Sequence, residues 1–258
     1  MNMPLKLNKI DGDTVRENIV NNRARLESFL AADSSSPMRT DPVRYSRRLA
    51  DAALELGLGL YQQEGERAEI QECLALAGAQ LCSLFLLERP NAAISPLEFE
   101  KALALATCFC PPEVYMSVSV PPLSKFFADP QVLAFYQVLA RYLDVLRNFI
   151  TSGHLDHAAW KSVETECLRN NAGRYDALVN LAKLRAMQAV DSGDAAILNQ
   201  SIAVLVQDHE DQALHGENQR STRGFLCLPA LMFANLGATR NLVCTVVSPY
   251  LPLRLLGK

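Results

Sequence analysis

Long apolar runs are missing from this chain. No uninterrupted apolar stretch reaches roughly 18 to 20 residues, the length that a helix needs to cross a bilayer. The first residues, Met1 to Asp13, also lack the apolar core of a secretory signal peptide. We therefore expect a cytoplasmic protein that is neither inserted into a membrane nor exported by the general secretory route.

Sequence signatures of catalysis are missing as well. The glycines form neither a G-x-G-x-x-G pattern nor a P-loop, so no phosphate-binding loop is visible. No serine has G-x-S-x-G flanks, and no cysteine lies in a recognisable catalytic context. These absences predict a protein that is not an enzyme and that uses no cofactor.

Metal ligands at a useful spacing are scarce. The "HLDH" stretch, His154 to His157, lacks the glutamate of the zinc-protease motif, and Asp156 is explained more simply as a helix cap. Cys108 and Cys110 form a C-x-C pair with no second pair at metal-ligand spacing. The seven cysteines lie mostly in apolar runs, so we expect reduced thiols that pack as small hydrophobic side chains, and no metal site.

The chain has little excess of charge of either sign. A net charge of -3 and a pI near 5.9 argue against direct binding to nucleic acid, because such binders concentrate Lys and Arg on one face. The charge is uneven, however. Residues 1–50 contain nine Lys or Arg and six Asp or Glu, a balance of +3, whereas residues 191–220 contain one Arg and six Asp or Glu, a balance of -5.

Amphipathic segments with capping signals fill most of the chain. Thr14 with Glu17, and Ser95 with Glu98, match the capping box, and Asp41 and Asp129 each precede a proline. Helices are therefore predicted at about 14–32, 42–63, 66–89, 96–109, 131–150, 155–169, 173–191, 194–214 and 228–236, with 111–122 as a connecting segment and Gly153, Gly193 and Gly237 among the stops.

These helices predict an all-α fold. Short links between successive helices favour antiparallel hairpins, so we expect an irregular helical bundle or solenoid that forms one domain over 1–258. The prolines near 111–129 leave open a boundary between two lobes. Alternating β-branched residues at 242–247 predict at most one short C-terminal β element. The aromatic residues expected in the core are Phe126, Phe127, Phe135, Tyr136, Tyr142 and Trp160.

An acidic segment, "QDHEDQALHGENQR", covers the end of one predicted helix and the loop after it. It contains Asp208, Glu210, Asp211 and Glu217 beside two histidines. Side chains that follow one another along a helix end point in several directions, so convergence in a catalytic pocket is not expected. A solvated acidic face is the simplest interpretation, and the alternative is a charged surface for a basic protein partner.

The last part of the chain carries a family resemblance. Its features are Arg223-Gly224, the "CLPAL" helix start, the small residues Ala234 and Gly237, and "SPYLPLRLL" from Ser248 to Leu256. Together they resemble the C-terminal portion of immunity protein family 49 of bacterial polymorphic toxin systems. The upstream helical hairpins agree with this family in general character.

The resemblance implies a cytosolic antidote that is encoded beside a secreted toxin and that blocks the toxin's active site or substrate path. It implies no catalytic residues. Many toxins that act on nucleic acid have a basic cleft, so Asp208, Glu210, Asp211 and Glu217 are the predicted toxin-binding residues. Two other interpretations stay open: a helical scaffold, such as an effector adaptor, chaperone or regulatory module, and an enzyme whose site is assembled from distant residues. The sequence also leaves a homodimer open.

Overall fold

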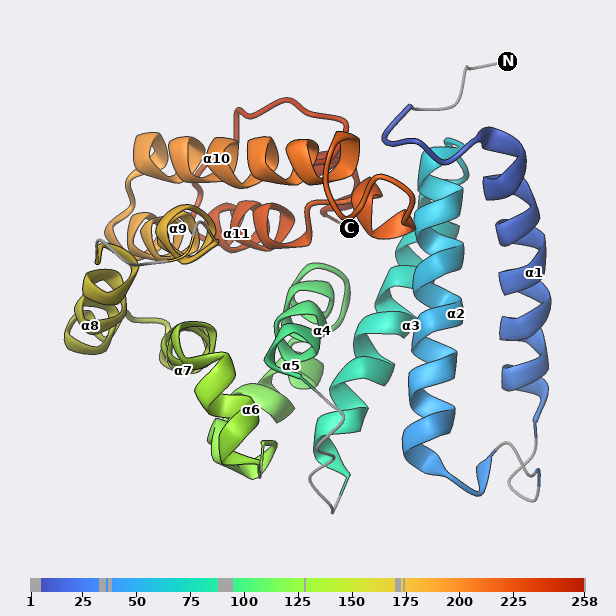
Figure 1. Cartoon of the computed structure of the whole chain (residues 1–258), viewed down its shortest axis with the longest axis horizontal. Coiled ribbons are helices and arrows are strands. Elements are labelled where there is room, and N and C mark those ends of the chain that lie inside the picture. The colour runs from blue at the N-terminus through green and yellow to red at the C-terminus, as the bar shows by residue number, and fades with distance from the viewer. Residues whose placement is uncertain are drawn as a thin grey trace.

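Helices make up the regular structure of this protein. The computed structural model describes residues 6–32, 36, 39–87, 95–127, 129–169, 173 and 175–257, and the side chains of 132–134 are not described (Figure 1). These parts contain no β-strand, so the predicted all-α class is confirmed. No helix within the same ranges is long and apolar enough to span a membrane.

The α-helices form an irregular bundle. In chain order they are α1 (Gly12–Ala31), α2 (Pro42–Gln62), α3 (Arg67–Leu86), α4 (Pro96–Phe109), α5 (Pro112–Ser119), α6 (Pro130–Phe135), α7 (Gln137–Ser152), α8 (His157–Cys167), α9 (Leu181–Ser192), α10 (Ala195–Leu214) and α11 (Leu228–Ala238). Tyr175–Asn180 forms a π-helical turn before α9, and Leu123–Lys125, Thr222–Phe225 and Leu253–Leu255 are 3₁₀ turns.

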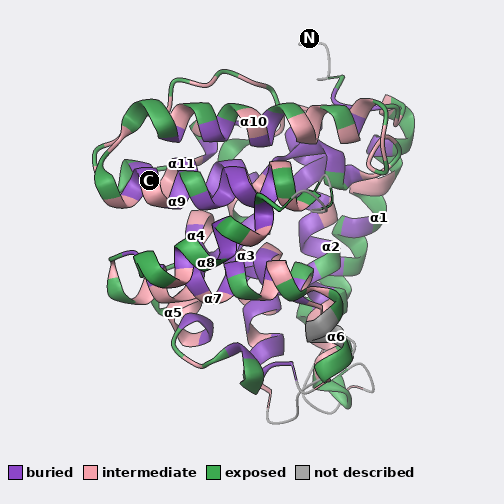
Figure 2. Cartoon of the chain, turned by 60° about the vertical axis from the view of Figure 1, so that its left-hand side comes forward, coloured by how far each residue is buried: buried purple, intermediate pink, exposed green. Residues whose placement is uncertain are grey.

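The helix α4 is the centre of the fold. Helices α1, α2 and α3 stand side by side as antiparallel hairpins, whereas α9, α10 and α11 form a second group (Figure 1). Helix α4 packs against both α3 and α11, and residues 102–107 on it are all buried. Exposed residues lie on the outer sides of α1 and α10 (Figure 2). The core therefore runs through α4 from one group to the other.

The N-termini of α1, α2 and α4 can be compared with the capping signals predicted from the sequence. Asp41 caps α2 with Pro42 directly after it, and Ser95 with Glu98 forms the predicted capping box of α4. The capping box predicted at Thr14 is wrong. Asp11 caps α1 instead, and its carboxylate accepts hydrogen bonds from the Thr14 amide at 2.8 Å and the Thr14 hydroxyl at 2.6 Å. A carboxylate is the stronger acceptor for the positive end of a helix.

The segments 111–122 and 131–150 differ from the prediction. The segment 112–119 was expected to be a connector but forms α5, with Pro112 in the first turn where its missing N–H costs nothing. The helix predicted at 131–150 is divided at Tyr136 into α6 and α7. Phe135, expected in the core, is 81% exposed at this break, and Tyr136, also expected there, is half-buried. The other aromatic residues of that set are buried as predicted: Phe126, Phe127, Tyr142 and Trp160.

The β element predicted near 242–247 does not form within the described structure. Residues 242–248 are extended but lie beside α10 with no partner strand. The Asn199 side chain occupies one edge of this segment: its Nδ2 donates to the Val243 carbonyl at 3.0 Å, and its Oδ1 accepts from the Thr245 amide at 2.6 Å. One side-chain amide thus supplies the donor and the acceptor that a neighbouring strand would offer.

Gly237 is not the stop of α11 that the sequence suggested. The helix continues to Ala238, and the chain reverses at Asn241, which adopts φ 62° while the Leu242 amide donates to the Gly237 carbonyl at 2.9 Å. A Cβ atom at Gly237 would lie only 2.6 Å from Leu198 Cδ2 on α10. The glycine therefore serves close helix packing rather than termination.

The C-terminal tail closes the fold. The Tyr250 carbonyl accepts from the Cys227 amide at 2.9 Å, and the Tyr250 hydroxyl donates to the Leu7 carbonyl at 2.7 Å. Gln71 on α3 donates to the Leu255 carbonyl at 2.8 Å, and the Tyr61 hydroxyl on α2 donates to the Pro249 carbonyl. The tail thus joins the first hairpins to the start of α11.

We predict that Gly78→Ala destabilises the protein by about 1–3 kcal/mol, the usual cost of overpacking a tight core. A Cβ atom at Gly78 would lie 3.0 Å from the backbone nitrogen of Ala106, so α3 and α4 would have to separate. Urea unfolding measures the change. Gly12→Ala is the control, because its Cβ meets no atom closer than 3.5 Å, and equal losses in both variants would contradict the prediction.

Candidate functional site

Three adjoining cavities form one groove on the surface. The first, of ≈ 470 Å³, and the third, of ≈ 210 Å³, share His209, Asn218 and Pro229 in their walls. The second, also of ≈ 470 Å³, shares Tyr175 with the first and Leu97 with the third. The groove therefore runs between the start of α4, the π-helical turn, the end of α10 and the start of α11.

Apolar side chains that would normally be buried line the second cavity. Leu97, Phe135 and Tyr175 are all exposed there. The rings of Phe135 and Tyr136 meet edge to face with their centroids 4.8 Å apart, which fixes their orientation. Large exposed apolar side chains that gather in a hollow are typical of surfaces that bind a partner.

The charges in the groove are separated. Asp208 and Glu217 line the first cavity and Asp176 lines the second, and the described residues that line these two include no Lys or Arg. Lys101 and Arg223 line the third cavity. One part of the groove is therefore acidic, and the positive side chains are confined to its far end.

The four acidic residues predicted from the sequence do not all reach the groove. Asp208 and Glu217 do, whereas Glu210 is half-buried on the side of Tyr250 and Asp211 is exposed outside the lining. Residues two apart on a helix point about 200° apart, which separates Glu210 from Asp208. Glu217 returns to the groove because the chain turns after α10, where the Asn218 amide donates to the Gln212 carbonyl at 3.1 Å.

His209 belongs to the wall of the groove and not to a catalytic pair. Its Nε2 lies 3.2 Å from the Gly224 carbonyl, and its ring packs edge to face against Tyr250. Burial lowers the pKa of His209, although the Gly224 carbonyl and the charge of Asp208 oppose this shift. The ring is therefore neutral near pH 7, with Nε2 donating to the carbonyl.

The inner wall of the groove contains a buried ion pair that the sequence analysis missed. The Lys183 side chain is 0% exposed, and its Nζ lies 2.6 Å from Glu100 Oε1 on α4. Nζ also donates to the Tyr175 hydroxyl at 3.0 Å and lies 3.4 Å from Asn180 Oδ1. The pair connects the central helix α4 with α9 of the second helix group, and it holds the hydroxyl of a groove-lining tyrosine.

The surroundings of Lys183 favour the charged form of its amine. Burial alone would lower the pKa of Lys183, but the Glu100 carboxylate and the Tyr175 hydroxyl outweigh it, so the pKa lies above its ordinary value. The Lys183 ammonium also faces the Tyr142 ring at 5.3 Å, a cation–π contact. The sequence signal was a lysine within the apolar run "NLAKLRAM", but no local pattern identifies Glu100 as its partner.

Among the described residues that line the groove, Lys101 has the side chain best suited to chemical reaction. Burial lowers its pKa, and the charge of Arg223 adds to the effect, whereas Asp51, Glu98 and Glu55 oppose it. An amine with a lowered pKa in an apolar cavity can act as a nucleophile. Here three carboxylates favour the protonated form, so the arrangement suits a fixed positive charge better.

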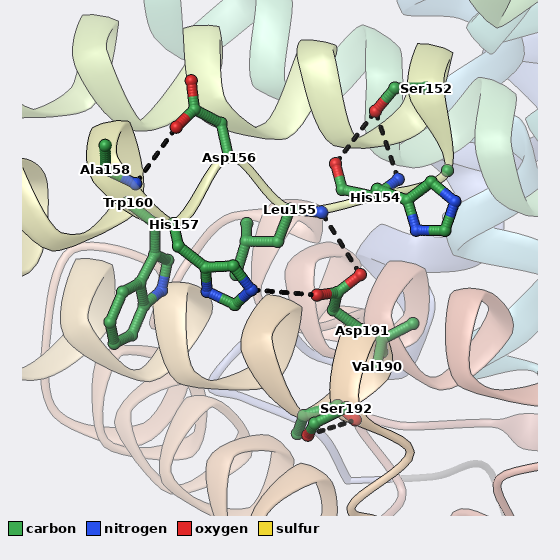
Figure 3. A network of polar contacts seen from close by, with 12 residues as sticks. Ser152, His154, Leu155, Asp156, His157, Ala158, Trp160, Val190, Asp191 and Ser192 are labelled. Atoms are coloured by element: carbon green, nitrogen blue, oxygen red, sulfur yellow. Dashed lines mark hydrogen bonds and ion pairs between the residues drawn. The ribbon is translucent and has the colours of Figure 1, made fainter.

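The two histidines of "HLDH" do not converge. His157 Nε2 lies 3.6 Å from Asp191, while His154 points away on the other side of Leu155 (Figure 3). Asp156 caps α8, as predicted, by accepting from the Ala158 and Ala159 amides, each at 3.0 Å. Nowhere in the described ranges do three or more His, Cys, Asp or Glu side chains gather as a metal site would require.

The C-x-C cysteines are structural. Both are free thiols, and Cys110 Sγ donates to the Ala75 carbonyl at 3.2 Å. Burial raises the pKa of Cys108 and raises that of Cys110 to about 11, so neither forms a thiolate readily near neutral pH.

We predict that Lys183→Met lowers the free energy of unfolding by roughly 3–5 kcal/mol, because Glu100 is left as an uncompensated buried charge. Adding Glu100→Leu should restore most of the loss by removing that charge. Arg16→Met is the control: Arg16 pairs with Asp13, both side chains are exposed, and such surface pairs contribute at most about 1 kcal/mol. Urea unfolding of the four proteins tests this, and a double variant less stable than Lys183→Met would contradict it.

We predict that the stability conferred by neutral His209 decreases as the pH falls below its ordinary pKa of 6.5. The unfolded chain then binds a proton that the folded chain, with its lowered pKa, accepts less readily. Melting temperatures are measured from about pH 7.5 to about pH 5, a range that brackets the ordinary pKa of histidine. Over this range the melting temperature should drop more for the wild type than for His209→Gln. The exposed His215→Gln serves as control, and an identical pH dependence in all three proteins would contradict the assignment.

Comparison of the chain with family models gives no match, and comparisons with curated proteins and with solved structures give none either. The resemblance to immunity protein family 49 therefore stays a prediction that rests on the residues of the C-terminal segment.

Proposed function

We propose that the protein is a cytoplasmic immunity protein. It binds a toxin through the groove and so blocks the toxin's active site or substrate path. The observation that carries this proposal is the lining of the first two cavities: among the described residues there, aromatic side chains are exposed beside three carboxylates, with no Lys or Arg. That combination suits a basic protein surface.

Protein interfaces use aromatic side chains as anchors and charges for steering. Phe135 and Tyr175 present large apolar surfaces at a low entropic cost, which is typical of the residues that dominate binding energy. Asp176, Asp208 and Glu217 attract a basic partner over a distance and raise its association rate. A cleft that binds nucleic acid has the complementary charge, and an inhibitor that fills it excludes the substrate.

The toxin-neutralising role comes from the sequence resemblance, and the groove supports protein binding more generally. The tail residues Tyr250, Leu251 and Leu255 in the matching segment are buried, so they stabilise the fold and do not form the binding surface. A helical adaptor, chaperone or regulatory module would use the same groove for a different partner. The identity of that partner separates these interpretations.

The experiment is a rescue assay with the product of the gene next to the one for this chain. We predict that co-expression with the wild type protects cells from that product, and that Asp208→Asn combined with Glu217→Gln weakens binding. The association rate should fall several-fold at low salt, and less at high salt where the charges are screened.

The controls separate the groove from the rest of the acidic segment. Asp211→Asn with Glu27→Gln removes two exposed carboxylates outside the groove and should leave the rate within about twofold. Equal losses in both double variants would indicate a general effect of net charge. No protection by the wild type, together with binding to a different protein, would instead favour the adaptor or regulatory interpretation.

A further inference from the structure

The extended segment 242–248 has the alternation of a strand in a sheet. Val243, Thr245 and Val247 are exposed, the two valines by 70% and 98%, whereas Leu242, Cys244 and Val246 are half-buried. In Figure 1 the segment is the red coil that follows α11 and runs along the outer side of α10. Figure 2 shows the same coil at the edge of the molecule. One face of a strand-like segment is therefore open to solvent.

The two edges of this segment differ in their hydrogen bonds. Asn199 bonds the main chain of Val243 and Thr245, which point to the same side. The main-chain groups of Cys244 and Val246 point to the other side. Across the part of the chain that the structure describes, no main-chain hydrogen bond reaches them, and the Val246 amide has only the Cys244 sulfur, a weak acceptor, nearby.

Nothing along this edge discourages pairing. Residues 241–253 contain no Asp, Glu, Lys or Arg, and proline first appears at position 249, after the segment. Exposed edges in native proteins usually carry charges, prolines or bulges that prevent another strand from adding. An uncharged, β-branched edge without these features is instead well suited to forming a sheet with another chain.

We propose that this edge pairs with the same edge of a second copy of the chain, as an antiparallel two-stranded sheet about a two-fold axis at Thr245. The axis places Cys244 opposite Val246 of the second copy and Val246 opposite Cys244 of the second copy. Each of these two pairs exchanges two N–H···O bonds, so four main-chain hydrogen bonds form.

A second copy fits because the edge is self-complementary. Its outward donors and acceptors are symmetric about Thr245, so the two-fold axis satisfies all of them at once. Val243 then lies opposite Val247 of the second copy, and the most exposed valines cover each other. Because residues 241–253 are uncharged, two copies bring no like charges together.

The structure also has room beside the segment. A cavity of ≈ 590 Å³ adjoins its first residues and is lined by Leu242, Cys244, Leu253 and Leu256 among others, all of them uncharged. Apolar side chains of an incoming strand can enter this space without burying a charge. The inference does not depend on the groove, which lies at the opposite end of α10.

Sedimentation velocity over a concentration series tests the dimer with the full chain. The wild type should show a monomer–dimer equilibrium, and Val246→Pro, which removes one outward N–H, should remain monomeric with an unchanged circular dichroism spectrum. The control is Val20→Ser, a polar change at another exposed valine, and this variant should dimerise normally. Serine is chosen instead of proline because Val20 lies within α1. A wild type that stays monomeric at every concentration overturns the proposal.

Disulfide trapping tests the register. Thr245 lies opposite its own copy in a non-hydrogen-bonded pair, with Cα atoms about 4.5 Å apart, so Thr245→Cys should form a disulfide-linked dimer on mild oxidation. Val243→Cys should not, because its copy lies roughly 13 Å away along the strands. A disulfide-linked dimer of Val243→Cys but not of Thr245→Cys would contradict the two-fold axis at Thr245. The proposal is also overturned if the chain stays monomeric and an extended foreign peptide occupies the edge.

Discussion

The burial of Lys183 against Glu100 is the interaction on which the arrangement of the groove depends. An ammonium group with 0% exposure is tolerated only when a carboxylate and further polar atoms surround it. Glu100 comes from the central helix α4 and Lys183 from α9, so the second helix group must keep one position relative to α4. The π-helical turn before α9 delivers Tyr175 and Asn180 to the same ammonium. The hydroxyl of Tyr175 is fixed inside while its ring remains part of the groove.

The C-terminal tail explains how the two ends of the chain stabilise one another. Tyr250 forms hydrogen bonds with both Leu7 near the N-terminus and Cys227 before α11. Next to Leu7, Asn8 Nδ2 donates to the Ser221 carbonyl at 2.7 Å and so holds the 215–225 loop. That loop carries Glu217 and Asn218 into the groove. The proline-rich tail is thus a structural clamp, and its effect on the candidate site is indirect, through the loop that it helps to position.

Local signals in the sequence predicted the helices but not the site. Asp41, Ser95, Asp156 and the left-handed Gly153 and Gly193 act through backbone groups within a few residues, so their roles can be read from the sequence. The partnership of Glu100 with Lys183 and the selection of Asp208 over Glu210 depend on how distant helices pack. The 242–247 segment has strand propensity, yet Asn199, from α10, takes the place of a partner strand. Propensity describes one chain segment, whereas a sheet needs two.

Helix α10 connects the two candidate surfaces without making them compete. Asn199 near its start holds the extended segment, and Asp208 near its end faces the groove, nine residues further on and therefore roughly 14 Å along the axis. A two-fold dimer through Thr245 would leave both grooves open. Two identical grooves on one particle would raise the local concentration of binding sites for a partner that presents two equivalent surfaces. Because pairing at the edge uses main-chain groups and binding in the groove uses side chains, each can change in evolution with little effect on the other.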